Sequence, residues 1–154
     1  MFKVGVIGPE STGKSTLCRY LASRYDGMLI KEYARAYVEN LNRPYTREDV
    51  EAIARHQIEE LTGVSNVETG VCFFDTELII TKVWMEHVYG ECPTWIEEAI
   101  HRYPMDVYLL CAPDIEWIPD PVRENPDLRD YLFGWYEREV QKLNIPYYII
   151  KHCN

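Results

Sequence analysis

Residues 8–16 read GPESTGKST, a complete G-x-x-x-x-G-K-[ST] phosphate-loop pattern that directly follows the apolar run at 2–7. Such a loop works only where it leaves a buried strand and opens a helix, because its backbone N–H groups and the helix N-terminus must converge on one anion. The sequence supplies both neighbours. Average residue usage would produce the bare pattern by accident in roughly 0.5% of chains of this length. A turn that merely contains Gly and Lys is therefore a poor alternative.

The residue types of this loop suit the binding of ATP. Gly8 and Gly13 let the backbone approach phosphate oxygens closely. Lys14 reaches the β- and γ-phosphates in a catalytic role, and the Ser15 hydroxyl is a ligand for Mg²⁺. The predicted cofactor-binding residues of the loop are Gly8, Glu10, Ser11, Thr12, Gly13, Lys14, Ser15 and Thr16.

Two carboxylates follow apolar runs and are candidate catalytic groups. Asp75 ends the run at 71–74 and fits a Walker B-like carboxylate that holds Mg²⁺ directly or through water; the alternative is a turn-forming Asp after a strand. Glu32 follows the short run at 28–30 and could accept a proton from an attacking hydroxyl or bind the metal. Glu32 and Asp75 therefore compete for the role of base.

Polar residues near Glu32 are candidates for binding the acceptor substrate. Arg35 could clamp a substrate hydroxyl or phosphate, and its alternative is an exposed ion pair with Glu32. Gln57 lies on an apolar helix face and is either a hydrogen-bonded core amide or a substrate contact. Lys31 would repel a positively charged ring if its side chain pointed into the pocket.

Residues 112–127 are rich in Pro and charge and are predicted to form a lid. Arg123 and Arg129 are candidates for stabilising charge on the transferring phosphoryl group, with Arg129 also grouped with the cofactor-binding residues. Asp120 and two prolines flank Arg123 and stiffen its loop. Trp117 could stack on a flat ring, as could Trp84, which instead fits a core stripe.

Strands that alternate with helices predict the fold. The expected strands are 2–7, 28–30, 71–75, 107–111 and 145–150, and the expected helices start near residues 16, 46, 76, 93 and 126. Asn125 is the expected N-cap of the last helix, and Gly90 ends the third. This order predicts an α/β fold, a three-layer α/β/α P-loop NTPase with a parallel, five-stranded sheet. Ligands of such sheets bind at the carboxyl ends of the strands, where the candidate residues gather.

Helical spacing also predicts which side chains face the core. Tyr20 and Tyr25 fall on the apolar stripe of the first helix, and Tyr131 falls on that of the last. Arg129 is expected to lie off that stripe, near the lid.

Composition narrows the class of protein. At 154 residues and 47% apolar composition, the chain is predicted to be a single P-loop kinase-like domain, 1–154. A net charge of −9 without a basic cluster disfavours binding to nucleic acid, and no apolar stretch is long enough to span a membrane. Five cysteines without a C-x-x-C pair, mostly inside apolar segments, indicate free thiols and a cytoplasmic location. The first strand leaves no room for a signal peptide.

Taken together, the motifs resemble the NadR-type nicotinamide riboside kinases and their ATPase relatives among the phosphate-loop kinases. Besides the loop, the resemblance rests on residues 32–35 (EYAR), Gln57, residues 74–77 (FDTE) with Thr81, Tyr89-Gly90 and residues 117–123 (WIPDPVR), in the order of the family. The family more often carries Asp where this chain has Glu77.

The resemblance implies transfer of the ATP γ-phosphate to the 5′-hydroxyl of nicotinamide riboside, a step of NAD salvage. It also implies that Glu32, Arg35, Gln57, Trp117 and Asp120 bind the nucleoside substrate. Two alternatives stay open, a kinase for another nucleoside and a regulatory nucleotide-binding ATPase that controls a partner.

Overall fold

The sheet of this protein is parallel and five-stranded, as predicted. The structure is a computed structural model that describes residues 1–114 and 128–151. The strand order is β2-β3-β1-β4-β5. The strands are β1 (Phe2–Ile7), β2 (Met28–Ile30), β3 (Val71–Asp75), β4 (Val107–Cys111) and β5 (Tyr147–Ile150). The central strand β1 pairs with β3 so that Val6 lies opposite Asp75, which brings the carboxyl ends of the two strands to one edge of the sheet.

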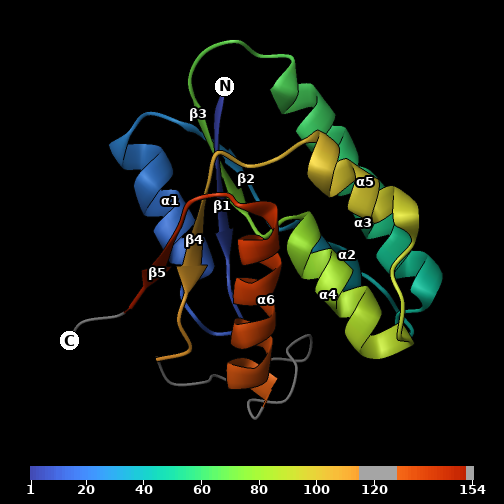
Figure 1. The fold of residues 1–154 in the computed structure, drawn as a ribbon. Helices are drawn as coiled ribbons and strands as arrows, with labels where there is room; N and C mark the ends of the chain where they lie inside the picture. The colour runs from blue at the N-terminus through green and yellow to red at the C-terminus, as the bar shows by residue number, and fades with distance from the viewer. Residues whose placement is uncertain (115–127, 152–154) are drawn as a thin grey trace.

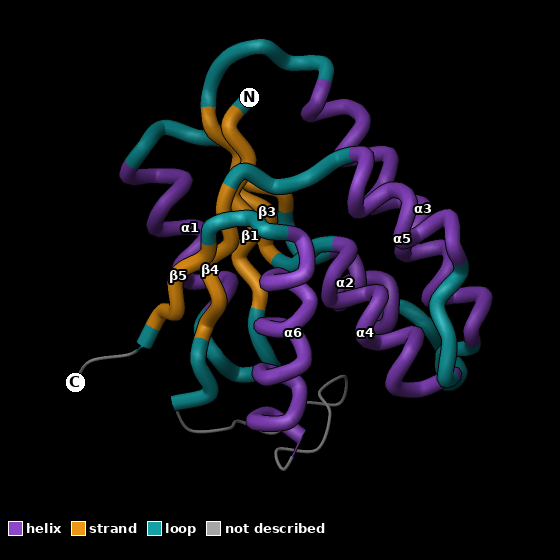
Figure 2. Tube along the Cα trace, in the orientation of Figure 1, coloured by secondary structure: helices purple, strands orange, loops and turns teal. Residues whose placement is uncertain are grey.

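Helices cover both faces of the sheet and complete three layers (Figure 1). The helices are α1 (Lys14–Arg24), α2 (Tyr33–Glu39), α3 (Arg47–Ser65), α4 (Leu78–Tyr89), α5 (Thr94–Arg102) and α6 (Arg129–Leu143). Helix α1 packs on one face, where Cys18 lies against Val4, Val6 and Phe73. The larger core lies on the other face, beneath α3, α4, α5 and α6. Figure 2 shows the strands between these two helical layers.

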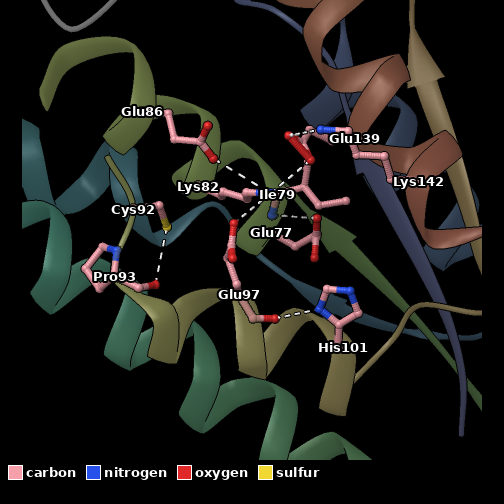
Figure 3. A network of polar contacts seen from close by, with 10 residues as sticks. All are labelled: Glu77, Ile79, Lys82, Glu86, Cys92, Pro93, Glu97, His101, Glu139 and Lys142. Atoms are coloured by element: carbon pink, nitrogen blue, oxygen red, sulfur yellow. Dashed lines mark hydrogen bonds and ion pairs between the residues drawn. The ribbon is translucent and has the colours of Figure 1, made fainter. Parts of the chain in front are cut away.

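A charged network ties the helices of the larger layer together (Figure 3). Lys82 of α4 donates to Glu139 Oε2 of α6 at 3.0 Å and pairs with Glu97 Oε1 of α5 at 3.1 Å. The Lys82 ammonium is largely shielded from solvent, so screening weakens these pairs less than at an open surface. The network therefore fixes α6 against α4, and both helices contribute to the cavity described below.

Three aromatic side chains assigned to core stripes are exposed instead. Tyr20 is 62% exposed, Tyr25 59% and Tyr131 52%. Periodicity identifies an apolar helix face but not how wide a surface the rest of the protein offers to it. Helix α1 fully buries only Lys14 and Cys18, and Tyr131 instead contacts the rings of His87 and Trp135. Arg129, expected off the stripe, is only 9% exposed at the start of α6.

Element boundaries follow the capping chemistry more closely than the apolar pattern. Thr46 and Asp49 form a capping box at the start of α3, and Gly90 ends α4 in the left-handed conformation, as predicted. Helix α4 starts at Leu78 and not at Thr76, because the Glu77 carboxylate caps it by accepting the Ile79 backbone N–H at 2.9 Å. The short helix α2 had no predicted counterpart, and Asn125 lies outside the described residues.

Candidate active site

The phosphate loop has the backbone geometry that its sequence requires. Gly8 has φ +153°, and a Cβ there would lie 2.7 Å from the Cys111 carbonyl oxygen, so no side chain fits. Gly13, at φ +80°, is the N-cap of α1. The loop therefore turns tightly from the end of β1 into a helix N-terminus, which is the geometry that presents backbone N–H groups to an anion.

Lys14 is buried within this loop. Its ammonium donates to the backbone oxygens of Gly8 and Pro9, both at 2.9 Å. Thr12 Oγ1 donates to the same Pro9 oxygen at 2.8 Å. The cation therefore lies over the loop, held by neutral carbonyl groups that an anion could replace. Thr16, by contrast, is exposed on α1.

Ser15 of the phosphate loop and Asp75, the predicted Walker B-like carboxylate, are in direct contact. Ser15 Oγ donates to Asp75 Oδ2 at 2.5 Å, and Asp75 is 5% exposed at the end of β3. The second carboxylate oxygen, Asp75 Oδ1, is buried without a hydrogen-bond partner among the described residues. A hydroxyl beside a buried carboxylate oxygen with unused acceptor capacity is the donor set that Mg²⁺ prefers.

The described residues contain no group of three or more His, Cys, Asp or Glu side chains that could hold a metal by themselves. Ser15 and Asp75 would therefore hold Mg²⁺ jointly with a ligand that brings oxygens of its own. Phosphate oxygens are the usual partners of Mg²⁺ in such sites, because the ion keeps most of its hydration and takes few protein ligands.

Thr76, directly after Asp75, has an unusual conformation. Its φ is +72°, a region that β-branched residues rarely adopt. The side chain is 6% exposed, and Oγ1 is buried without a hydrogen-bond partner in the described chain. Strain of this kind persists where the surrounding structure fixes the backbone, and it gathers at functional sites.

A cavity of about 100 Å³ adjoins the loop and Thr76. It lies among α2, α4, α6 and the phosphate loop, and its wall combines carboxylates, aromatic rings and aliphatic side chains. The lining residues are Glu10, Glu32, Ala34, Arg35, Val38, Tyr45, Thr76, Ile80, Thr81, Trp84, His87, Leu132 and Tyr136. Two predicted substrate-binding residues, Glu32 and Arg35, thus share one cavity. Glu10, predicted as a cofactor-binding residue, lines the same space.

Glu32 has the electrostatic environment of a group that titrates near neutrality. Burial raises the pKa of the Glu32 carboxyl to about 7; the nearby Lys14 ammonium lowers it, and the Glu10 charge raises it further. Glu32 is the N-cap of α2, at the end of the β2 segment. A carboxylate with such a pKa can accept a proton at physiological pH and can release it again.

Helix α2 follows Glu32 and contributes Ala34, Arg35 and Val38 to the cavity wall. None of its residues is fully buried. Side-chain contacts hold it against α3. Tyr37 donates to Asp49 Oδ1 at 2.8 Å, and the Tyr33 ring stacks on His56 with centroids 3.6 Å apart. Arg35 pairs with Glu39 of the same helix at 3.1 Å, whereas the alternative interpretation of Arg35 pairs it with Glu32.

Gln57 and Trp84 support the opposite wall. Gln57 is 6% exposed, and its Oε1 accepts a hydrogen bond from Thr81 Oγ1 at 2.6 Å. Gln57 is not among the lining residues, but its partner Thr81 is. Trp84 donates from Nε1 to the Tyr45 hydroxyl at 3.0 Å, and the two rings meet edge to face.

Sequence reasoning assigned Trp84 and Tyr136 to apolar core stripes and did not predict Tyr45 or His87 as residues of the site. The available signal was spacing. Ile80, Trp84 and His87 follow one face of the helix that starts just after Asp75. Trp117, Asp120 and Arg123, with most of the predicted lid, lie outside the described residues. Within 1–114 and 128–151, no helix is long and apolar enough to cross a membrane.

The family model of an AAA domain matches residues 3–154. The trifunctional NAD biosynthesis/regulator protein NadR of Escherichia coli (strain K12) is 26% identical over 126 residues, which are 78% of this chain. The NadR of Salmonella typhimurium matches equally. The chain spans about 30% of the length of these curated relatives.

Solved structures give the same relationship. The crystal structure of NadR protein in complex with NR superposes with a TM-score of 0.83 at 26% identity, over 96% of this chain and 45% of that one. Thymidylate kinase from Ehrlichia chaffeensis shares the fold, with a TM-score of 0.68 at 12% identity over 99% of this chain and 88% of that one. The chain is therefore similar to NadR in sequence and structure, and its fold is that of phosphate-loop kinases.

Proposed function

The chain belongs to the AAA-domain family, and from this premise we propose that it is an ATP- and Mg²⁺-dependent kinase that phosphorylates a nucleoside hydroxyl. The 5′-hydroxyl of nicotinamide riboside is the proposed acceptor. The observation that carries the proposal is that the phosphate loop and the cavity lie next to each other. The phosphate loop with Ser15 and Asp75 adjoins a cavity lined by Glu32, so a bound γ-phosphate and an acceptor hydroxyl can meet.

The residues divide the work of phosphoryl transfer. Backbone N–H groups of the loop and the Lys14 ammonium bind the β- and γ-phosphates, in exchange for the carbonyl contacts of Lys14. Ser15 and Asp75 would hold Mg²⁺, and the bound ion would supply positive charge that neutralises the phosphate oxygens. Glu32 accepts the proton of the acceptor hydroxyl while that oxygen bonds to the γ-phosphorus and the bond to ADP breaks. Asp75 is the alternative base.

The cavity suits a flat, positively charged ring. The carboxylates of Glu10 and Glu32 and the aromatic side chains of Trp84 and Tyr45 supply negative potential and flat surfaces. Lys31 is exposed and does not line the cavity, so it offers no local repulsion to a cation. The structural similarity to NadR protein in complex with NR supports the same acceptor.

ADP release tests the proposal directly. Purified protein with ATP and MgCl₂ is assayed with nicotinamide riboside, adenosine, thymidine and ribose. We expect nicotinamide riboside to stimulate ADP release most strongly, and Lys14→Ala to abolish this stimulation while thermal unfolding stays near that of the wild type. Stimulation by a neutral nucleoside alone would keep the kinase and replace the substrate. Slow hydrolysis that ignores every acceptor would favour a regulatory ATPase.

A further inference from the structure

We infer that the Thr76 hydroxyl binds a ribose hydroxyl of the acceptor, next to the hydroxyl that reacts. This role rests on the proposed function and adds to it a substrate-binding residue. Thr76 shares the cavity wall with Glu32, and it directly follows Asp75 at the end of β3. A ligand that touches Thr76 would therefore lie close to the nucleotide on the phosphate loop.

The Thr76 hydroxyl has no hydrogen-bond partner within the described chain, although the side chain is only 6% exposed. Burial of a hydroxyl without a partner destabilises the folded protein. Valine has nearly the same shape and would fill this position without that cost. Packing therefore does not explain the hydroxyl, whereas a ligand that supplies the missing hydrogen bond does.

Two other hydroxyl groups of the cavity wall already have partners. The Tyr45 hydroxyl accepts a hydrogen bond from Trp84 Nε1 at 3.0 Å, and Thr81 Oγ1 donates to Gln57 Oε1 at 2.6 Å. Thr76 Oγ1 keeps both its donor and its acceptor capacity. It can therefore bind a ligand hydroxyl, which is itself both a donor and an acceptor, in either direction.

The backbone is fixed on both sides of Thr76. The Thr76 N–H donates to the Val6 carbonyl oxygen of β1 at 3.0 Å. The next residue, Glu77, accepts the Ile79 N–H at 2.9 Å and so joins the segment to the start of α4 (Figure 3). Thr76 is thus held at φ +72° and cannot shift toward another partner. A group fixed in this way binds a ligand with little further loss of entropy.

Rotation about the Cα–Cβ bond of Thr76 would bring the hydroxyl to the ligand. Oγ1 is shielded from solvent, while the residue lines the cavity. Oγ1 and Cγ2 are both bonded to Cβ, and one step between staggered positions moves Oγ1 to a different side of the residue. Because Oγ1 has no partner to give up among the described residues, this rotation gains a hydrogen bond without losing one.

The chemistry of the transfer favours a hydroxyl that does not react as the partner of Thr76. The reacting oxygen uses its lone pair to attack phosphorus while Glu32 takes its proton. A further donor on that oxygen would withdraw the electron density that the attack needs. A ribose carries other hydroxyl groups nearby, and binding one of them orients the 5′-hydroxyl without weakening it as a nucleophile.

The kinetic test uses Thr76→Val, which removes the hydroxyl and keeps the β-branched shape. With nicotinamide riboside we expect KM to rise about tenfold, which corresponds to about 1.4 kcal/mol. We expect kcat to change less than about threefold, because this hydrogen bond is present both before and during transfer. Thr76→Ser keeps the hydroxyl and should restore most of the acceptor affinity. Thr62→Val is the matched control, because Thr62 is exposed on α3 and does not line the cavity.

Removal of hydroxyl groups from the substrate identifies the partner of Thr76. The 2′-deoxy and 3′-deoxy forms of nicotinamide riboside are compared with the parent in wild type and in Thr76→Val. For one of the two we expect the wild type to lose as much affinity as Thr76→Val loses for the parent. The two changes combined should then cost no more than either alone. The same penalty of Thr76→Val for all three acceptors would overturn the inference.

Measurements without acceptor separate this role from a role at the nucleotide or in folding. In Thr76→Val, ADP release without acceptor and the Kd of a fluorescent ADP analogue should each change less than about threefold. The melting temperature should equal or exceed that of the wild type, because the variant loses a buried hydroxyl without a partner. A lower melting temperature or a weakened nucleotide complex would overturn the inference.

The choice of acceptor distinguishes failure of this role from failure of the proposed function. If adenosine or thymidine is phosphorylated and nicotinamide riboside is not, the proposed substrate is rejected. Thr76→Val and the deoxy forms of the active nucleoside then decide the role of Thr76. If no nucleoside stimulates ADP release, the proposed function and the role of Thr76 are rejected together.

Discussion

The protonation state of Glu32 should control the rate. Burial raises the pKa of its carboxyl to about 7 from the ordinary 4.5. With that pKa, about 10% of the carboxyl is ionised at pH 6 and about 90% at pH 8, so kcat/KM should rise roughly tenfold across this interval. An unshifted carboxyl would already be almost fully ionised at pH 6 and would leave the profile flat.

The assay is the pH profile of kcat/KM for the acceptor, from pH 5.5 to 8.5, at saturating Mg²⁺ and ATP. Glu32→Gln should lower the rate by roughly 100- to 10,000-fold, the range of general-base catalysis. It should also abolish the fall of kcat/KM at low pH, the acid limb of the profile. Glu77→Gln is the control: Glu77 also has a pKa raised to about 7 by burial, yet it caps α4 and does not line the cavity. A limb that persists in Glu32→Gln, or a flat wild-type profile, would refute the assignment of Glu32 as the base.

Further predictions concern the metal, the acceptor and stability. Asp75→Asn should raise the Mg²⁺ concentration needed for half-maximal activity at least tenfold, while ADP affinity without metal stays near wild type; an unchanged Mg²⁺ requirement would exclude Asp75 from the metal site. Trp84→Leu should raise KM for the acceptor and leave KM for ATP unchanged, as steady-state kinetics can show, because Trp84 lines the cavity and not the loop. Urea unfolding should show stability falling as pH rises from 4.5 through 7, because the raised pKa values of Glu32 and Glu77 mean that the folded protein binds more protons than the unfolded chain. Each group contributes of the order of 3 kcal/mol at most, and Glu77→Gln should flatten the slope.

The sequence predicts well how the phosphate loop and Asp75 lie together, because this arrangement depends on a contiguous loop and on the order of the strands. The loop residues 8–16 are contiguous, and a parallel sheet must bring the end of β3 beside the end of β1, so the Ser15–Asp75 contact follows from topology. The five predicted strands and the three-layer fold are confirmed. The predicted start of α4 is two residues too early, because the Glu77 side chain caps the helix and Leu78 is its first residue.

The cavity proposed to bind the acceptor is less predictable, because it is assembled from side chains far apart in the chain. Tyr45, Trp84 and Tyr136 come from a loop and two helices, and no local pattern distinguishes a cavity wall from a core. Periodicity assigned Trp84 to an apolar face, but not whether another element fills the space beside it. The same limit explains Tyr20, whose apolar helix face meets no further layer.

The strained backbone at Thr76 lowers the thermal stability of the protein, and a substitution that relieves the strain should raise its melting temperature. A buried β-branched residue at φ +72° costs about 1–3 kcal/mol, and glycine would adopt this conformation without that cost. A laboratory selection for thermal survival alone should therefore replace Thr76 early, with Gly or Asn. Because Thr76 joins Asp75, the proposed metal ligand, to the cavity wall, such survivors should lose turnover as they gain melting temperature. If Thr76 is retained in nature, selection for the catalytic rate has outweighed selection for thermal stability at this position.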